Sequence, residues 1–68
     1  MPQSFDTLRV GHRYKMINYG EETCFELVSI KNRADYIVMD LNSREKFNLK
    51  KLVEYGKGRD YDLFELEE

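Results

Sequence analysis

Apolar and polar residues alternate over short stretches of this chain, and polar turns separate the stretches. In the first stretch, His12, Tyr14 and Met16 fall on one side of an extended chain, while Arg13 and Lys15 fall on the other. A period of two places successive side chains on opposite faces of a β-strand, whereas an amphipathic helix has a period of 3.6. Only one alanine occurs in the 68 residues, which also disfavours helices. The pattern therefore predicts an all-β chain.

Five stretches are predicted to be strands, around residues 12–16, 23–31, 35–41, 45–48 and 61–66. Short polar turns flank the third strand and join the second, third and fourth into an antiparallel meander. Ile17 breaks the alternation of the first strand and predicts a bulge or a bend there. Phe25 and Leu27 lie on one face of the second strand and Ile30 on the other. We therefore expect the core side of this strand to change along a sharply curved course.

The period changes after the fourth strand. Leu49, Leu52 and Val53 are spaced i, i+3, i+4, with Asn48 as a candidate N-cap and Gly56 as a stop. This spacing predicts one short helical turn. The predicted core comprises twelve apolar residues, namely Met16, Ile17, Phe25, Leu27, Ile30, Ile37, Met39, Phe47, Leu52, Val53, Leu63 and Phe64.

Five short strands with one helical turn before the last strand resemble the SH3-like small barrels, the group that includes the Tudor and KOW modules. Residues 10–14 (VGHRY), 25–30 (FELVSI) and 36–41 (YIVMDL) carry the resemblance. It implies a five-stranded antiparallel barrel. An OB-like barrel or an open α+β sheet shares parts of the pattern and stays an alternative. We expect a single domain over residues 1–68, with residues 1–8 and 66–68 less ordered.

Few residues of this chain are suited to catalysis or to metal binding. His12 and Cys24 are the only residues of their types, which excludes a disulfide framework and leaves little for a metal site. The segment Gly56-Lys57-Gly58 lacks the spacing and the Ser or Thr of a phosphate-binding P-loop. We therefore expect no enzyme, no metal and no cofactor.

The sequence also gives no indication of a secretory signal or a membrane-spanning helix. Residues 1–6 have neither the basic nor the apolar part of a secretory signal. The longest apolar run, residues 36–39, is far shorter than the ~20 residues of a membrane-spanning helix. We expect a cytoplasmic protein that does not bind membranes.

Resemblance to the Tudor group implies an aromatic cage, in which ring faces enclose a methylated Lys or Arg through cation–π attraction. Tyr19 stands in the first loop, and Tyr36 with Asp35 or Asp40 stands on the third strand. The turn at residues 42–44 has no aromatic residue. The alternative interpretation is that Tyr36 is half-buried on its strand and Tyr19 caps a hairpin.

A protein or peptide is the partner that needs the least special chemistry, because small barrels have exposed strand edges and shallow grooves. Tyr19, Tyr55 and Tyr61 are the predicted contact residues, since each flanks a glycine or a charged turn. Alternatively, these tyrosines close the ends of the barrel. A domain this small also gains core by pairing, so we expect a monomer or a weak homodimer.

Weak binding of single-stranded RNA or DNA is the alternative function. Basic and aromatic residues are mixed within one segment, at Lys50, Lys51, Tyr55, Lys57 and Arg59. The last nine residues hold five acids and no Lys or Arg, so residues 1–59 hold all 11 basic residues and 8 acids, a net charge of +3. The acidic end follows the basic segment directly, and we expect it to weaken phosphate binding.

Overall fold

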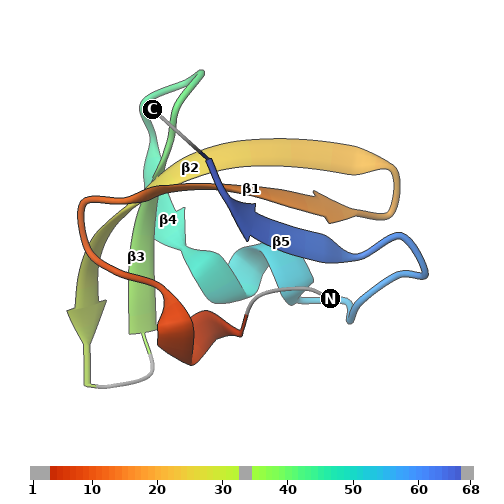
Figure 1. Cartoon of the computed structure of the whole chain (residues 1–68), viewed down its shortest axis with the longest axis horizontal. Coiled ribbons are helices and arrows are strands. Elements are labelled where there is room, and N and C mark those ends of the chain that lie inside the picture. The colour runs from red at the N-terminus through yellow and green to blue at the C-terminus, as the bar shows by residue number, and fades with distance from the viewer. Residues whose placement is uncertain (1–3, 33–34, 67–68) are drawn as a thin grey trace.

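The computed structural model describes residues 4–32 and 35–66, and these form one antiparallel five-stranded sheet with two short 3₁₀ turns (Figure 1). The all-β fold predicted from the sequence is therefore confirmed. Residues 1–3 and 67–68, part of the ends expected to be less ordered, lie outside the described residues. In chain order the elements are η1 (Phe5–Thr7), β1 (Arg13–Asn18), β2 (Glu21–Lys31), β3 (Asp35–Asp40), β4 (Lys46–Asn48), η2 (Leu49–Val53) and β5 (Asp62–Glu65).

The strand order is β4-β3-β2-β1-β5, so the first four strands form a meander and β5 returns to lie beside β1. β4 and β5 are the two edges, and within the described residues no pairing between them closes the sheet into a barrel. The meander and the helical turn agree with the sequence, while closure of the barrel is not confirmed.

β2 is the longest strand and connects the two halves of the sheet. Its first half pairs with β1 and its second half with β3, and the register shifts between Leu27 and Ser29. This bulge lies where the sequence predicts the core side of the strand to change. Figure 1 shows β2 bending, so that β1 and β5 run across the direction of β3. The bulge predicted at Ile17 is wrong, because β1 pairs with β2 in unbroken register from Arg13 to Asn18.

A two-residue turn joins β1 to β2. Asn18 pairs with Glu21, and between them Tyr19 has φ 51° and Gly20 has φ 76°. Positive φ at both central positions defines a type I′ turn, whose twist matches that of the flanking strands. Glycine is suited to this conformation because it has no Cβ.

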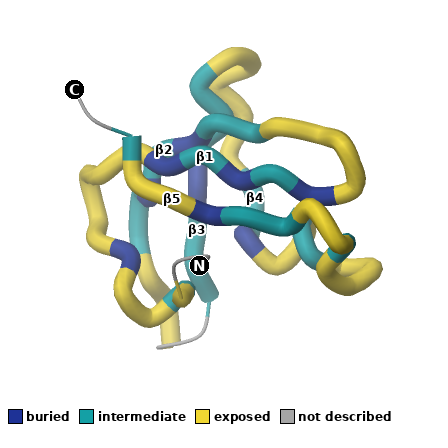
Figure 2. The backbone as a smooth tube through the Cα atoms, turned by 45° about the vertical axis from the view of Figure 1, so that its right-hand side comes forward, coloured by how far each residue is buried: buried dark blue, intermediate teal, exposed yellow. Residues whose placement is uncertain are grey.

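The core lies on the concave face of the sheet, and Figure 2 shows its buried segments on neighbouring strands. Met16, Phe25, Leu27 and Leu63 are buried as predicted, and Phe47, Leu52 and Val53 pack against them partly buried. Four further buried residues, not predicted from the sequence, belong to the core, namely Leu8, Tyr14, Val38 and Leu49.

Five core predictions are wrong: Ile17, Ile37 and Met39 are half-buried without packing against the core cluster, and Ile30 and Phe64 are 41% and 39% exposed. Residues 36–39 are all apolar, so alternation cannot decide which face of β3 is buried. The register decides it, because Val38 lies opposite buried Leu27. Leu63 and Phe64 are adjacent in one strand and point to opposite faces, so only one of them can enter the core.

Candidate functional site

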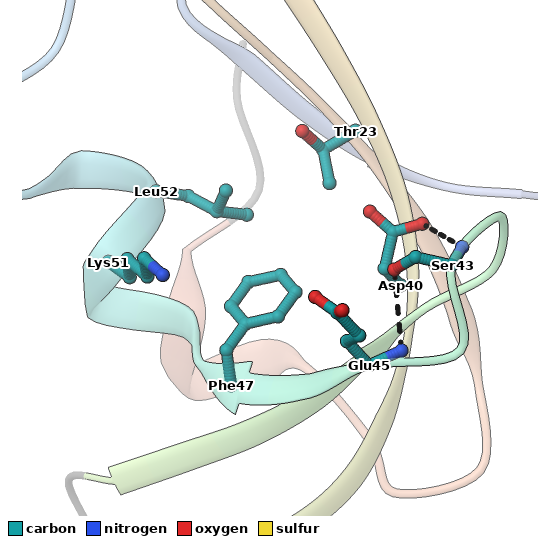
Figure 3. A pocket seen from close by; sticks show the side chains of 7 residues that line it. All are labelled: Thr23, Asp40, Ser43, Glu45, Phe47, Lys51 and Leu52. Carbon is teal, nitrogen blue, oxygen red and sulfur yellow. Dashed lines mark hydrogen bonds between the residues drawn. The ribbon is translucent and has the colours of Figure 1, made fainter.

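A groove of about 280 Å³ opens between the start of β2, the β3–β4 turn and η2 (Figure 3). Phe47 and Leu52 form its apolar part, and both also pack against the core. In Figure 3 these two side chains face one another across the groove, with Thr23 above them. The complete lining is Thr23, Asp40, Ser43, Glu45, Phe47, Lys51 and Leu52.

The left side of the groove in Figure 3 is held by the connection between β4 and η2. Asn48 is the N-cap of η2, and its side-chain oxygen accepts a hydrogen bond of 3.0 Å from the amide of Lys50. The cap predicted from the sequence is therefore confirmed. Because η2 starts directly after β4, it brings Lys51 and Leu52 opposite Phe47.

The right side of the groove is the tight β3–β4 turn, which its own side chains stabilise. Oδ1 of Asp40 accepts hydrogen bonds from the amides of Asn42 (2.7 Å) and Ser43 (3.1 Å). The hydroxyl of Ser43 accepts one from the amide of Glu45 at 3.3 Å. Asp40 and Ser43 thus serve mainly to shape the turn.

The groove has three charged side chains, and none of them has an ion-pair partner within residues 4–32 and 35–66. Asp40 accepts hydrogen bonds within the turn, which leaves the carboxylate of Glu45 and the ammonium of Lys51. Figure 3 shows the carboxylate of Glu45 directed toward the space beside Phe47. The apolar floor of this groove can hold an apolar side chain of a ligand. The acid on one side and the base on the other can orient the ligand's neighbouring backbone or charged groups.

A second cluster ties the tip of the β1–β2 hairpin to the loop after η2. Asp60 accepts hydrogen bonds from the amides of Tyr19 (2.9 Å) and Gly20 (2.7 Å). The hydroxyl of Tyr19 donates to the carbonyl of Tyr55 at 3.0 Å. The side chain of Asn18, only 8% exposed, bonds to the same loop. We call these contacts the hairpin clamp.

The three tyrosines predicted to contact a partner have different environments. Tyr19 belongs to the hairpin clamp, and Tyr55 is 86% exposed. Tyr61 is half-buried against the core. Burial raises the pKa of Tyr61 above its ordinary value, and the neighbouring Asp62 adds to this shift. Contact of these tyrosines with a partner stays a prediction.

The structure does not bring the residues of the expected aromatic cage together as free side chains. Tyr36 is half-buried and its ring centre lies 6.0 Å from that of Phe5. Asp35 pairs with Lys50 at 3.6 Å, and Tyr19 occupies the hairpin turn. The alternative interpretation from the sequence, in which Tyr36 is half-buried and Tyr19 caps a hairpin, is confirmed.

The cations of the predicted nucleic-acid segment are spread over η2 and the following loop. Lys50 pairs with Asp35, and Lys51 lines the groove. Nζ of Lys57 lies 4.8 Å from the ring centre of Tyr61 and 5.9 Å from that of Phe5. Arg59 is exposed. Two of the four cations, Lys50 and Lys57, thus already contact other side chains of the chain.

His12 and Cys24 do not form a pair. Nδ1 of His12 lies 3.3 Å from Glu65, and Cys24 is half-buried opposite Lys15. Across the described part of the chain, no three His, Cys, Asp or Glu residues gather in a way that could hold a metal ion. No helix there is long and apolar enough to cross a membrane.

The groove itself was not predicted from the sequence. Thr23 on β2 stands more than twenty residues before Glu45 and Phe47, and only the helical turn at Leu49–Val53 gave a local signal. Comparison with protein-family models, with curated proteins and with solved structures finds no match to this chain.

Proposed function

We propose that this chain is a non-enzymatic interaction module of the SH3-like small-barrel kind, which binds a peptide segment of a protein partner in the groove. The order of elements supports the fold assignment, because the chain has five short strands and one helical turn before the last strand, the pattern on which the resemblance rests.

One observation carries the function: partly exposed Phe47 and Leu52 face an open groove flanked by Glu45 and Lys51, which lack ion-pair partners among the described residues. Covering apolar surface is favourable by roughly 25 cal/mol per Å². Charges beside such a surface contribute orientation and selectivity more than affinity. A peptide side chain on Phe47 and Leu52, with polar neighbours near Glu45 and Lys51, uses both features.

Selection from a random heptapeptide library on the whole chain tests this function. Selected peptides are then titrated into ¹⁵N-labelled protein, and we expect amide shifts at Phe47 and Leu52. Glu45→Lys should weaken binding of a selected peptide about tenfold, because it reverses one of the two flanking charges that orient the peptide. Glu54→Lys is the matched control, because Glu54 is exposed on the same part of the chain but does not line the groove.

Failure to select any peptide, or shifts that avoid the groove, would contradict the proposed function. The alternative predicted from the sequence, nucleic-acid binding, is tested by a second titration of the labelled protein. The ligand is a short mixed-sequence single-stranded RNA, added at low and then at physiological salt. Shifts confined to residues 50–61 and reversed by salt would favour nucleic-acid binding instead.

A further inference from the structure

Among residues 4–32 and 35–66, the N-terminal half of β2 has a strand on one side only. β2 pairs with β1 from Glu21 to Glu26, but its pairing with β3 begins at Phe25, opposite Asp40. Beyond that pair, Leu41 donates one more hydrogen bond to the carbonyl of Cys24 at 3.0 Å. The chain then turns away into the β3–β4 turn. Figure 1 shows no strand on this side of β2 between that turn and the β1–β2 hairpin.

Backbone groups on this side of β2 point outward without a strand to bind. Leu27 bonds toward β1, because its amide donates to His12 and its carbonyl accepts from Gly11. Successive residues of a strand direct their amides to opposite sides. Odd-numbered residues from 21 to 27 therefore face β1, and Glu22 and Cys24 face the other side. Within the part of the chain that the structure describes, the amide and carbonyl of Glu22 thus form a free edge.

This free edge borders the groove. Thr23 lies between Glu22 and Cys24 and lines the groove together with Phe47 and Leu52. Figure 3 shows the side chain of Thr23 directed toward the same space. A strand added along Glu22 would therefore place every second side chain over the groove.

The charges around the edge of β2 determine which kind of strand can pair with it. Glu21 lies on the edge and Asp40 and Glu45 line the groove, against one groove cation, Lys51, while the edge residue Glu22 already pairs with Lys15 at 3.0 Å. A second copy of this chain would bring its own Glu21 and Glu22 against the same residues, and like charges placed opposite one another destabilise a strand pair. A basic strand complements the edge.

We propose that the partner peptide, whose binding in the groove is the proposed function above, adds as a strand to the free edge of β2 at Glu22, with an apolar residue in the groove and basic residues on either side of it. Backbone hydrogen bonds to Glu22 hold the peptide, and Phe47 and Leu52 select its apolar residue.

The probe is a capped heptapeptide, acetyl-Lys-Thr-Lys-Val-Lys-Thr-Lys-amide, titrated into the whole ¹⁵N-labelled chain. We expect shifts at Glu22, Cys24, Phe47 and Leu52, and slower hydrogen exchange of the Glu22 amide. The same peptide with Glu in place of Lys should bind at least about tenfold more weakly. Equal binding of the two peptides would overturn the charge selection.

Backbone N-methylation separates strand addition from simple filling of the groove. One version of the peptide carries N-methyl groups on the backbone amides of its Lys residues. The other version carries them on the backbone amides of its Thr and Val residues. Alternate amides of a strand face opposite sides, so one version should lose about tenfold or more in affinity and the other less than about twofold. Equal affinities with shifts still at Phe47 and Leu52 would overturn strand addition and leave the proposed function intact. Absence of shifts with every peptide would contradict both.

A protein variant tests the same edge. Glu22→Pro removes the outward amide, and proline is tolerated on an edge where its nitrogen faces solvent. Glu22→Gln is the matched control, because both variants lose the 3.0 Å ion pair with Lys15 but only the proline variant loses the amide. With folding checked by the amide spectrum, Glu22→Pro should bind the Lys peptide at least about tenfold more weakly than Glu22→Gln. Equal binding would overturn the proposal.

Discussion

Asn18 is a polar residue inside an otherwise apolar core, and its side chain is fully used. Its Nδ2 donates to the carbonyls of Leu52 (3.2 Å) and Gly56 (3.1 Å), and its Oδ1 accepts from the amide of Gly58 (2.8 Å). Buried polar groups cost little when every hydrogen bond is made and much when one partner is removed. One side chain at the end of β1 therefore fixes the loop that follows η2.

Asn18→Ala should lower the free energy of unfolding by about 1–3 kcal/mol, because three backbone groups lose their partner at once. Urea denaturation followed by tyrosine fluorescence measures this change. Asn42→Ala is the control, since Asn42 is exposed and only its backbone amide is bonded. Equal effects of the two substitutions would contradict the role assigned to Asn18.

Tyr61 makes stability sensitive to alkaline pH. Burial, with a further contribution from Asp62, raises its pKa above the ordinary value of 10.0, so the native state holds the phenolic proton more tightly than the unfolded chain does. The free energy of unfolding should therefore fall as pH rises through the native pKa. Denaturation curves between pH ~8 and pH ~11 measure the slope, which Tyr61→Phe should reduce.

Lys15 titrates in the same alkaline range. Its hydrogen bond and charge interaction with Glu22 raise its pKa, so part of the slope should remain in Tyr61→Phe. A slope as steep as that of the unsubstituted protein would show that Tyr61 does not contribute.

At the scale of elements, the sequence predicts strands better than it predicts their faces. Polar turns delimit β3, and its range is nearly that expected, but Ile37 and Met39 were assigned to the core in place of Val38. Val38 is buried because it pairs with Leu27 and because the register of β2 shifts between Leu27 and Ser29. Both depend on a neighbouring strand, which the alternation within one segment cannot reveal.

The loop after η2 docks on the β1–β2 hairpin through a close approach at Gly58. A Cβ at this position would lie 3.0 Å from Asp60 Oδ1 and 3.0 Å from a ring carbon of Tyr19. Gly58→Ala should therefore push apart the hairpin clamp and cost about 1–3 kcal/mol in the free energy of unfolding, measured by urea denaturation.

This mechanism is checked by measuring the effect of Gly58→Ala in a protein that also carries Asp60→Ala. Asp60→Ala removes one of the two groups that the new methyl would meet, so Gly58→Ala should cost less in Asp60→Ala than in the unsubstituted chain. Additive effects would argue against a clash within the clamp.

At the scale of the whole molecule, small size makes single core residues decisive. A core of this size rarely gives a net stability above about 3–5 kcal/mol. Leu63 is fully buried and Phe64, next to it on β5, is 39% exposed. Leu63→Ala should cost about 2–5 kcal/mol and leave the domain largely unfolded at 25 °C.

Phe64→Ala should leave the domain folded at a cost of about 1 kcal/mol or less, although it removes the larger side chain. Circular dichroism and amide spectra of the two variants measure the difference. Unfolding of both variants would mean that the outer face of β5 is as important to the fold as its inner face.

The groove is also a property of the whole molecule. Thr23 and Phe47 lie on different strands and Leu52 follows on η2, and the bend of β2 is what places all three around one space. The tyrosines, by contrast, stood out in the sequence because each flanks a glycine or a charged turn, although Tyr61 is half-buried against the core. Such local signals come from neighbouring residues in the chain, whereas the concave site depends on long-range topology.

The hairpin clamp has a consequence for the thermodynamics of recognition. Tips of two-stranded hairpins ordinarily fluctuate, yet Asp60 binds two amides at this tip. The edge at Glu22 is therefore preorganised, and the loss of conformational entropy on pairing falls almost wholly on the incoming peptide. Affinity should then rank peptides by how readily each adopts an extended form when free in solution.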